Sequence, residues 1–323
     1  MVRCFLILFL FIFFFQRSAD AQFTHKIDSL LTIYNTTAND SDKVVACGKL
    51  AEYYYVYQLG KEGDSVLLQQ LKIAELSQNK NLFLMAFFGK AIMNISSWGK
   101  KETFDKTLEF VRKGLEYSKS IAREDYVTLS YIRISTLYRK RVDLDKAFYN
   151  ANSAVISSQN INNDSIKILA LIELGDTYLD KGESLLAFKN YSNAFDNAIK
   201  AENFNLQSEI YHRFSALYIS FENEFIAKEY LLRSLELNRK YNNGEGLIKD
   251  YIDLARLTEE RTYIEKAITI SDSLNLENYF LKAKGIMFGY YTYKIAISDS
   301  SLKFLNNNPD LKQLYINIGM PFD

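Results

Sequence analysis

Two histidines and two cysteines are the residues of this 323-residue chain best suited to metal binding or nucleophilic catalysis. His25 and His212 lie far apart, and no group of His, Cys and Asp has the spacing of metal ligands. The sequence contains neither a glycine-rich phosphate loop nor a Gly-x-Ser-x-Gly elbow. Acidic pairs such as Glu259 and Glu260 are far more common on solvated helix surfaces than in catalytic dyads. We therefore expect a protein without enzymatic activity, metal or cofactor.

The composition favours a folded, helical chain. Basic and acidic residues number 39 each, so the formal net charge is zero, whereas a general nucleic-acid binder needs a basic surface. Charged residues at 24% and apolar residues at 48% are normal for a globular protein, which excludes wholesale disorder. With only 13 Gly and 2 Pro, little is left to separate the strands of a β fold. The expected fold class is all-α.

The first 21 residues resemble a targeting segment. A short basic start with Arg3 precedes an apolar run over residues 4–15, and Ala19-Asp20-Ala21 matches the small-x-small site of signal peptidase. Twelve apolar residues are too few to span a bilayer comfortably, since roughly 20 are needed. We expect a signal peptide over 1–21, cleavage before Gln22, and location in the periplasm or cell envelope, or secretion. A short signal anchor remains the alternative.

The remainder of the chain has no apolar stretch of membrane-spanning length without a charge. Cys47 would be its one cysteine, so an internal disulfide is not expected. Because Cys47 sits in a helical pattern of apolar residues, we interpret it as a small core residue.

An internal repeat of 40 residues dominates the rest of the sequence. Columns of similar residues recur in step, among them Ala147, Ala187, Ala227 and Ala267, and upstream of these Trp98, Tyr138, Tyr178 and Tyr218. An earlier unit around Leu50 and Ala51 fits after an insertion of four residues in its turn, near Gly60 to Ser65.

The spacing within each unit predicts a helical hairpin. Leu171, Leu174, Gly175 and Tyr178 lie on one face of a first helix, and Ala187, Tyr191, Ala194 and Phe195 on one face of a second. The tight turn over residues 181–184 separates them, and Ser184 is a candidate cap for the second helix. The small residues at the crossing, Gly175 facing Ala187, would let the two backbones approach. Such hairpins must stack to bury both faces, which predicts a right-handed superhelical solenoid of about six units.

These residues resemble the tetratricopeptide repeat family. The hallmark is matched by Leu174-Gly175-x-x-Tyr178 followed by Ala187, Tyr191 and Ala194, although the common repeat has 34 residues and a terminal Pro that is absent here. The lengthened repeats are similar to the periplasmic arrays of bacterial two-component sensors and regulators. No membrane, kinase or DNA-binding segment follows them, which indicates a free-standing array.

The resemblance implies that the first helix of each unit lines a concave groove. In this register the candidate binding residues are Thr136, Arg139, Lys140, Asp176, Asp180, His212 and Arg256. The surface is mixed in charge and lacks the residue set with which some family members hold a terminal carboxylate. Ordinary solvated helix surface is the alternative interpretation for each residue, and a pH-sensing role is an alternative for His212.

The expected organisation is a signal peptide over 1–21, an N-terminal helix over 22–40, the array over 41–275, and capping helices with a tail over 276–323. Two function classes remain open. One is an exported scaffold that binds a protein or peptide partner in its groove. The other is a detached periplasmic sensory module that signals to a separate membrane kinase or transcription regulator.

Overall fold

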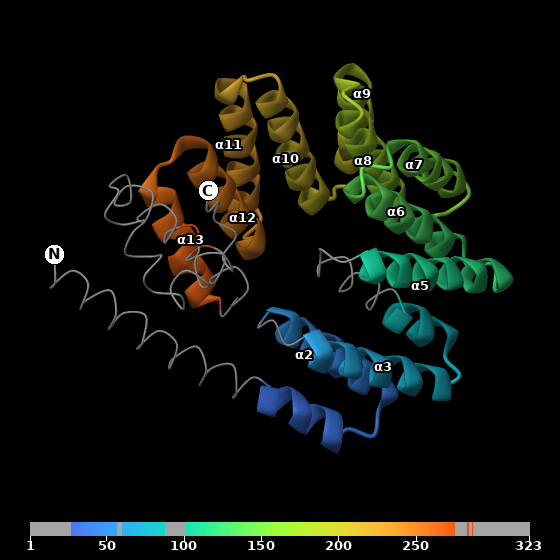
Figure 1. Cartoon of the computed structure of the whole chain (residues 1–323). Coiled ribbons are helices and arrows are strands. Elements are labelled where there is room, and N and C mark those ends of the chain that lie inside the picture. Colours follow the sequence, from blue (N-terminus) through green and yellow to red (C-terminus); the bar gives the residue numbers. More distant parts are fainter. Residues whose placement is uncertain (1–26, 57–59, 88–100, 275–282, 284–285, 287–323) are drawn as a thin grey trace, which may run out of the picture. The chain divides into compact units, whose positions relative to one another are not determined.

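A computed structural model of the protein describes residues 27–56, 60–87, 101–274, 283 and 286 (Figure 1). The signal peptide and the C-terminal tail predicted from the sequence lie outside these residues, apart from positions 283 and 286. Regular secondary structure in the described residues is entirely helical, which confirms the predicted all-α class. The chain forms two compact units, Met1–Ile161 and Asn162–Asp323.

The described residues of unit 1 form a helix over residues 27–36, a helix over residues 80–87, and five longer helices. The longer ones are α2 (Asp40–Val56), α3 (Gly60–Leu76), α5 (Lys101–Ser120), α6 (Glu124–Lys140) and α7 (Leu144–Ser158). Helices α2 and α3 pack together, and α6 packs against both α5 and α7. The predicted turn near Gly60 to Ser65 is wrong, because α3 already begins at Gly60.

Helix α3 of the first hairpin is out of step with the 40-residue period. The buried face of α3 includes Leu67, Gln70 and Ala74, which lie 44 residues before Val111, Gly114 and Ser118 of α5. Leu67, Ala74, Val111 and Ser118 have no exposed side-chain surface. The four additional residues therefore lie between α3 and α5 and not in the turn of the first hairpin.

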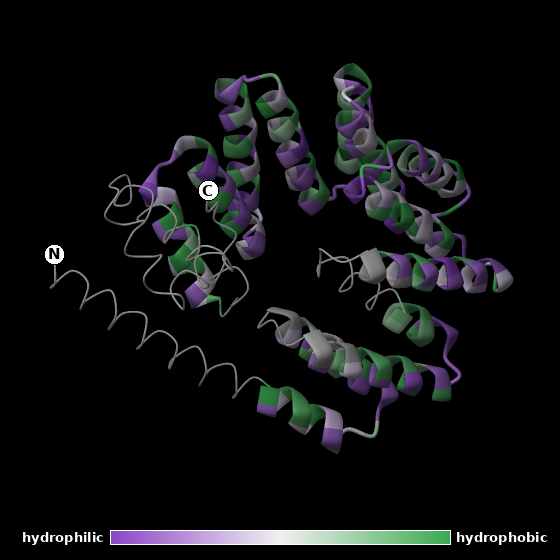
Figure 2. Ribbon diagram, viewed as in Figure 1, coloured by the Kyte–Doolittle hydropathy of each residue, from purple (hydrophilic) through white to green (hydrophobic). Residues whose placement is uncertain are grey.

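Residues 162–274 of unit 2 form three consecutive hairpins. Their helices are α8 (Asp164–Asp180), α9 (Ser184–Lys200), α10 (Phe204–Ser220), α11 (Glu224–Lys240), α12 (Gly244–Thr258) and α13 (Arg261–Ser273). Each first helix packs on its own second helix, α10 also packs on α9, and α12 also packs on α11 (Figure 1). The predicted stacking of helical hairpins is thus confirmed within this unit. Hydrophilic and hydrophobic residues are interspersed along these helices (Figure 2), as expected where one face of a helix is apolar and the other polar.

Asparagine caps and left-handed residues set the ends of these helices. Asn163, Asn203 and Asn243 each accept a hydrogen bond from the backbone N–H three residues ahead, at the start of α8, α10 and α12. The predicted cap Ser184 is wrong, because Glu183 holds that position without a side-chain bond. In several turns between consecutive helices, one residue has a positive φ angle, which ends the preceding helix; these residues are Ala122, Val142, Gly182, Glu202, Glu222 and Asn242.

The core follows the predicted 40-residue column of alanines. Ala147, Ala187, Ala227 and Ala267 have no exposed surface. The prediction that Gly175 faces Ala187 is wrong, because a Cβ placed on Gly175 would lie 2.5 Å from Cε1 of Tyr191. Gly175 therefore makes room for the Tyr191 ring, which is fully buried in the core of the α8–α9 hairpin.

Candidate functional site

Three of the predicted binding residues lie on α6 of unit 1. Thr136 and Arg139 are half-buried, and Lys140 is exposed. The Thr136 hydroxyl donates to the carbonyl oxygen of Ile132 at 3.0 Å, so this bond stays within the helix. The other four predicted residues belong to unit 2, where the charged side chains fall into two clusters.

The first cluster joins α8 to α10 around Asp176. Its carboxylate accepts a hydrogen bond of 2.8 Å from the Tyr191 hydroxyl and lies 2.9 Å from Nε of Arg213. Arg213 also contacts Glu209 one turn earlier on α10, at 3.1 Å. Asp180 lies exposed one turn beyond Asp176. Asp176 was among the predicted binding residues, whereas its partner Arg213, and Glu209 that contacts Arg213, were not.

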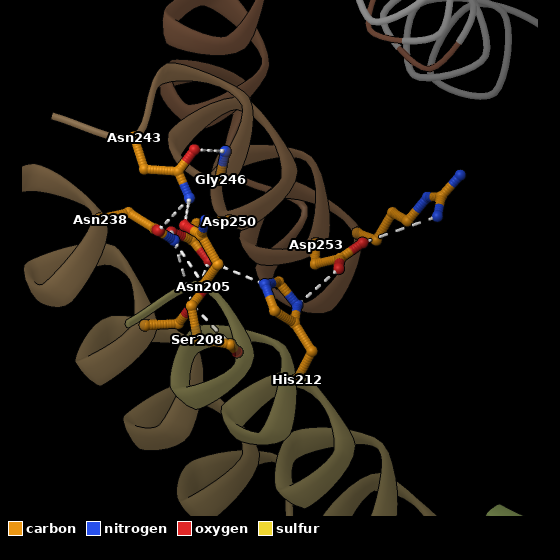
Figure 3. A network of polar contacts seen from close by, with 10 residues as sticks. Asn205, Ser208, His212, Asn238, Asn243, Gly246, Asp250 and Asp253 are labelled. Atoms are coloured by element: carbon orange, nitrogen blue, oxygen red, sulfur yellow. Dashed lines mark hydrogen bonds and ion pairs between the residues drawn. The ribbon is translucent and has the colours of Figure 1, made fainter. Parts of the chain in front are cut away.

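The second cluster centres on His212, whose predicted position facing a groove is wrong. The residue is only 7% exposed. Its Nε2 lies 2.9 Å from Oδ1 of Asp250, and its Nδ1 lies 2.9 Å from Oδ2 of Asp253, both on α12 (Figure 3). The N–H directions are not aligned as in regular hydrogen bonds, so the two contacts are ion-pair contacts. His212 connects α10 to α12.

Asp253 links His212 to another predicted residue. Its second carboxylate oxygen lies 3.7 Å from Nη1 of Arg256, whose side chain is 53% exposed. The structure thus brings His212 and Arg256 together through an acidic residue that the sequence analysis missed. Asp253 is itself partly exposed, so this end of the cluster reaches the surface while the His212 ring does not.

Behind His212 lies a buried polar network formed by α10, α11 and α12 (Figure 3). Asp250 accepts hydrogen bonds of 2.6 Å from the Ser234 hydroxyl and 2.7 Å from the Asn238 amide. The same amide donates to the Ser208 hydroxyl at 2.8 Å, and the hydroxyls of Ser208 and Ser234 lie 2.8 Å apart. Asp250 and Ser234 have no exposed surface. The carboxylate therefore has partners at both oxygens, as a buried charge requires.

The network extends to the start of α12. Asn243, the cap of that helix, donates at 2.8 Å to the side-chain oxygen of Asn238 and at 3.0 Å to that of Asn205. A Cβ on Gly246 would lie 2.4 Å from Oδ1 of Asn238. Glycine at this position is what allows Asn238 to approach the α12 backbone and reach Asp250.

The cluster shifts the pKa values of two members. Burial lowers the pKa of the His212 imidazole, but the contacts with Asp250 and Asp253 favour its charged form more strongly. The net result is a pKa above the ordinary value of 6.5. For Asp253, burial raises the pKa and the contact with His212 lowers it, and the net pKa lies below the ordinary value.

In the described residues, no group of three or more His, Cys, Asp and Glu side chains has the arrangement of a metal site. No helix within those ranges is long and apolar enough to cross a membrane. The charged and hydrogen-bonding groups of the two clusters can recognise a partner. The residues that reach the surface for this purpose are Asp180, Glu209, Arg213, Asp253 and Arg256.

Three solved structures resemble the chain over most of its length. A Rap protein complexed with competence and sporulation factor is 10% identical, and the match covers 90% of this chain and 80% of that one with a TM-score of 0.60. Aspartyl phosphate phosphatase F from Bacillus subtilis is 12% identical, with coverages of 92% and 77% and a TM-score of 0.55. The apo form of the quorum sensor NprR from B. thuringiensis is 15% identical, with coverages of 96% and 85% and a TM-score of 0.51.

At these identities the likeness establishes the fold alone. No protein-family model and no curated protein matches the sequence. The consecutive hairpins of about 40 residues, the hallmark residues at their crossings and the similarity to these helical proteins agree with one another. The chain is a helical solenoid built from tetratricopeptide-like repeats.

Proposed function

We propose that the protein is an exported, non-enzymatic scaffold that binds a protein or peptide segment on the first-helix face of unit 2, formed by α8, α10 and α12. The observation that carries this proposal is the placement of surface-reaching charged side chains on all three first helices. Asp180 lies on α8, Arg213 and Glu209 on α10, and Asp253 with Arg256 on α12.

This face suits an extended partner better than a small molecule. The positions repeat at each hairpin, so the partner would meet one set of side chains after another along the stack. Charges of both signs and the exposed apolar residue Ile219 give the face a mixed character. A peptide with its own alternation of charged and apolar side chains fits such a surface.

A sensory role is the second candidate. Among the similar structures, one is of a quorum sensor and another is of a complex with a competence and sporulation factor. Their fold is shared at low sequence identity, which supports the idea that this solenoid responds to a bound factor. In that case a separate membrane kinase or transcription regulator would read its occupied state.

Capture of partners by the purified protein from an envelope extract tests the proposal. We expect the pair Asp180→Arg and Arg256→Glu to weaken retention of a specific partner by about tenfold or more, since both changes reverse exposed charges on the first-helix face. The pair Lys189→Glu and Glu236→Arg is a matched control, because it reverses two exposed charges on the second helices α9 and α11 without altering net charge.

Equal retention by both pairs would contradict binding at the first-helix face. A captured membrane kinase or regulator would favour the sensory role over the scaffold. Export is tested on the same material, where N-terminal sequencing of envelope-fraction protein should read from Gln22. Retention of Met1 would defeat that part of the proposal.

A further inference from the structure

The buried contact among α10, α11 and α12 in unit 2 is polar, whereas the equivalent contact one period earlier is apolar. We call its six residues, Ser208, His212, Ser234, Asn238, Asp250 and Asp253, the polar seam. One period earlier, five of these positions hold the apolar residues Ile168, Ile172, Ala194, Ala198 and Ile210. Those five are buried in a single hydrophobic cluster. The fold therefore does not require polar side chains at these positions.

The seam buries a carboxylate that needs a compensating charge. Asp250 is 0% exposed, and burying an ionised carboxylate is costly unless it is paired and hydrogen-bonded. Ser234 and Asn238 donate neutral hydrogen bonds to it. His212, at 2.9 Å, is the partner in the seam that can carry a positive charge. The protonation state of His212 thus determines whether Asp250 has an ion-pair partner there.

The charges around His212 come from several helices. From α12, Asp250 and Asp253 favour the protonated ring, Lys249 opposes it, and Arg256 is paired with Asp253. On α10 itself, Arg213 is held by Glu209 and by Asp176 of α8. The groups that α11 presents to the seam, Ser234 and Asn238, are uncharged. The balance of these neighbours favours a charged histidine.

We propose that the polar seam is a pH-responsive lock, in which protonated His212 holds α12 against α10 through Asp250 and Asp253, and loss of the proton loosens the stacking of the last described hairpin. The inference does not depend on the proposed binding function. Deprotonation leaves two carboxylates on α12 facing a neutral ring, and one of them is fully buried.

The direction of the pH effect follows from the raised pKa of His212. A group with a folded-state pKa above its unfolded value contributes stability in full below the unfolded value, here about 6.5, and loses it as pH rises through the folded value. The lock is therefore closed on the acidic side of neutrality and opens toward alkaline pH. Asp253, with a lowered pKa, keeps its charge over this whole range.

Two measurements on the intact protein test the lock. Histidine imidazole NMR should give a pKa above about 6.5 for His212, with its signal assigned by the variant His212→Gln. Hydrogen exchange read by mass spectrometry, corrected for the intrinsic pH dependence, should show the protection of α12 relative to α9 falling between about pH 6 and about pH 9. The fall should be about tenfold for each unit by which the His212 pKa is raised.

The variants separate the lock from general alkaline weakening. His212→Gln should have low relative α12 protection at both pH values. The control His25→Gln, which removes the other histidine, should behave as the wild type. If relative α12 protection in the wild type is the same at both pH values, or if His212→Gln retains the full pH response, the proposal is wrong.

A second variant keeps the test interpretable if His212→Gln does not fold. The apolar seam Ser208→Ile, His212→Ile, Ser234→Ala, Asn238→Ala and Asp250→Ile copies the residues of the preceding hairpin. Replacing buried ionic groups by packed apolar ones is often neutral or stabilising, so this variant should fold. Its relative α12 protection should be independent of pH. A pH response that survives in the apolar seam would overturn the proposal, and the wild-type comparison remains decisive on its own.

Discussion

Gly175→Ala tests how α8 and α9 pack, and it sets two opposing effects against each other. Alanine in a helix interior is favoured over glycine by about 1 kcal/mol, so the substitution would be stabilising if α8 stood alone. In the folded protein the new Cβ would lie 2.5 Å from Cε1 and 2.7 Å from Cδ1 of Tyr191. Carbon atoms prefer separations of about 3.5–4.0 Å, so the ring or the helix must move.

The Tyr191 ring has little freedom to move away. It has no exposed surface, and its hydroxyl donates to Asp176 at 2.8 Å. Overpacking a rigid core typically costs about 1–3 kcal/mol, and two close contacts belong at the upper end of that range. After subtraction of the helix-propensity gain, we expect Gly175→Ala to lower the free energy of unfolding by about 1–2 kcal/mol.

Urea denaturation followed by far-UV circular dichroism measures this change, in a double-mutant cycle with Tyr191→Leu. Leucine lacks the ring atoms that the new Cβ would meet, so in that background Gly175→Ala should be neutral or stabilising by up to about 1 kcal/mol. The coupling between the two sites should therefore be about 1–3 kcal/mol. An equal effect of Gly175→Ala in both backgrounds would refute the argued contact.

Four further substitutions test the repeat and its turns. Ala187→Arg and Ala227→Arg should each lower the free energy of unfolding by more than about 2 kcal/mol in urea melts, because these fully buried positions cannot hold an unpaired charge. Lys189→Arg, on the exposed side of α9, should change the free energy of unfolding by less than about 0.5 kcal/mol. Equal stability of the alanine and lysine variants would invalidate the 40-residue register. Val142→Gly should raise the free energy of unfolding by about 0.5–1 kcal/mol. Val142 is a β-branched residue in the strained left-handed conformation, with φ 60°, and because it is 76% exposed, its removal costs little packing. A lower stability than the wild type would contradict this.

The sequence was sufficient to predict the hairpins because their signal repeats. Ala147, Ala187 and Ala227 occupy one column, and each is fully buried because two helices cross there. The direction in which Gly175 faces could not be read from spacing. Both Ala187 and Tyr191 lie within reach on α9, and only the packing decides which of them occupies the space that the glycine leaves.

The burial of His212 was predictable, although we predicted a groove position. The same column contains Ile132, Ile172 and Ile252, three isoleucines that are all buried, and such a column is typical of a core position. The 40-residue period also makes Ile252 the equivalent of His212 on α12, the neighbouring first helix. Asp250 and Asp253 lie close to Ile252 in the sequence and therefore near His212. What the sequence could not supply is the pairing itself, because the spacing does not distinguish carboxylates that face His212 from carboxylates that face solvent.

The location of the polar seam gives its titration a local effect. In a solenoid, stability is approximately a sum of terms within each hairpin and between neighbours, so a weakened contact acts mainly on the hairpins that share it. The α8–α9 hairpin rests on an apolar cluster that includes Tyr191 and Phe214 and contains no histidine or carboxylate among its buried members. The contact between α10 and α12 instead depends on the charge of one histidine. A change of pH would then alter how α12 stacks while α8 and α9 keep their packing. Asp253 and Arg256 would move with α12, so the first-helix face would change on one side only.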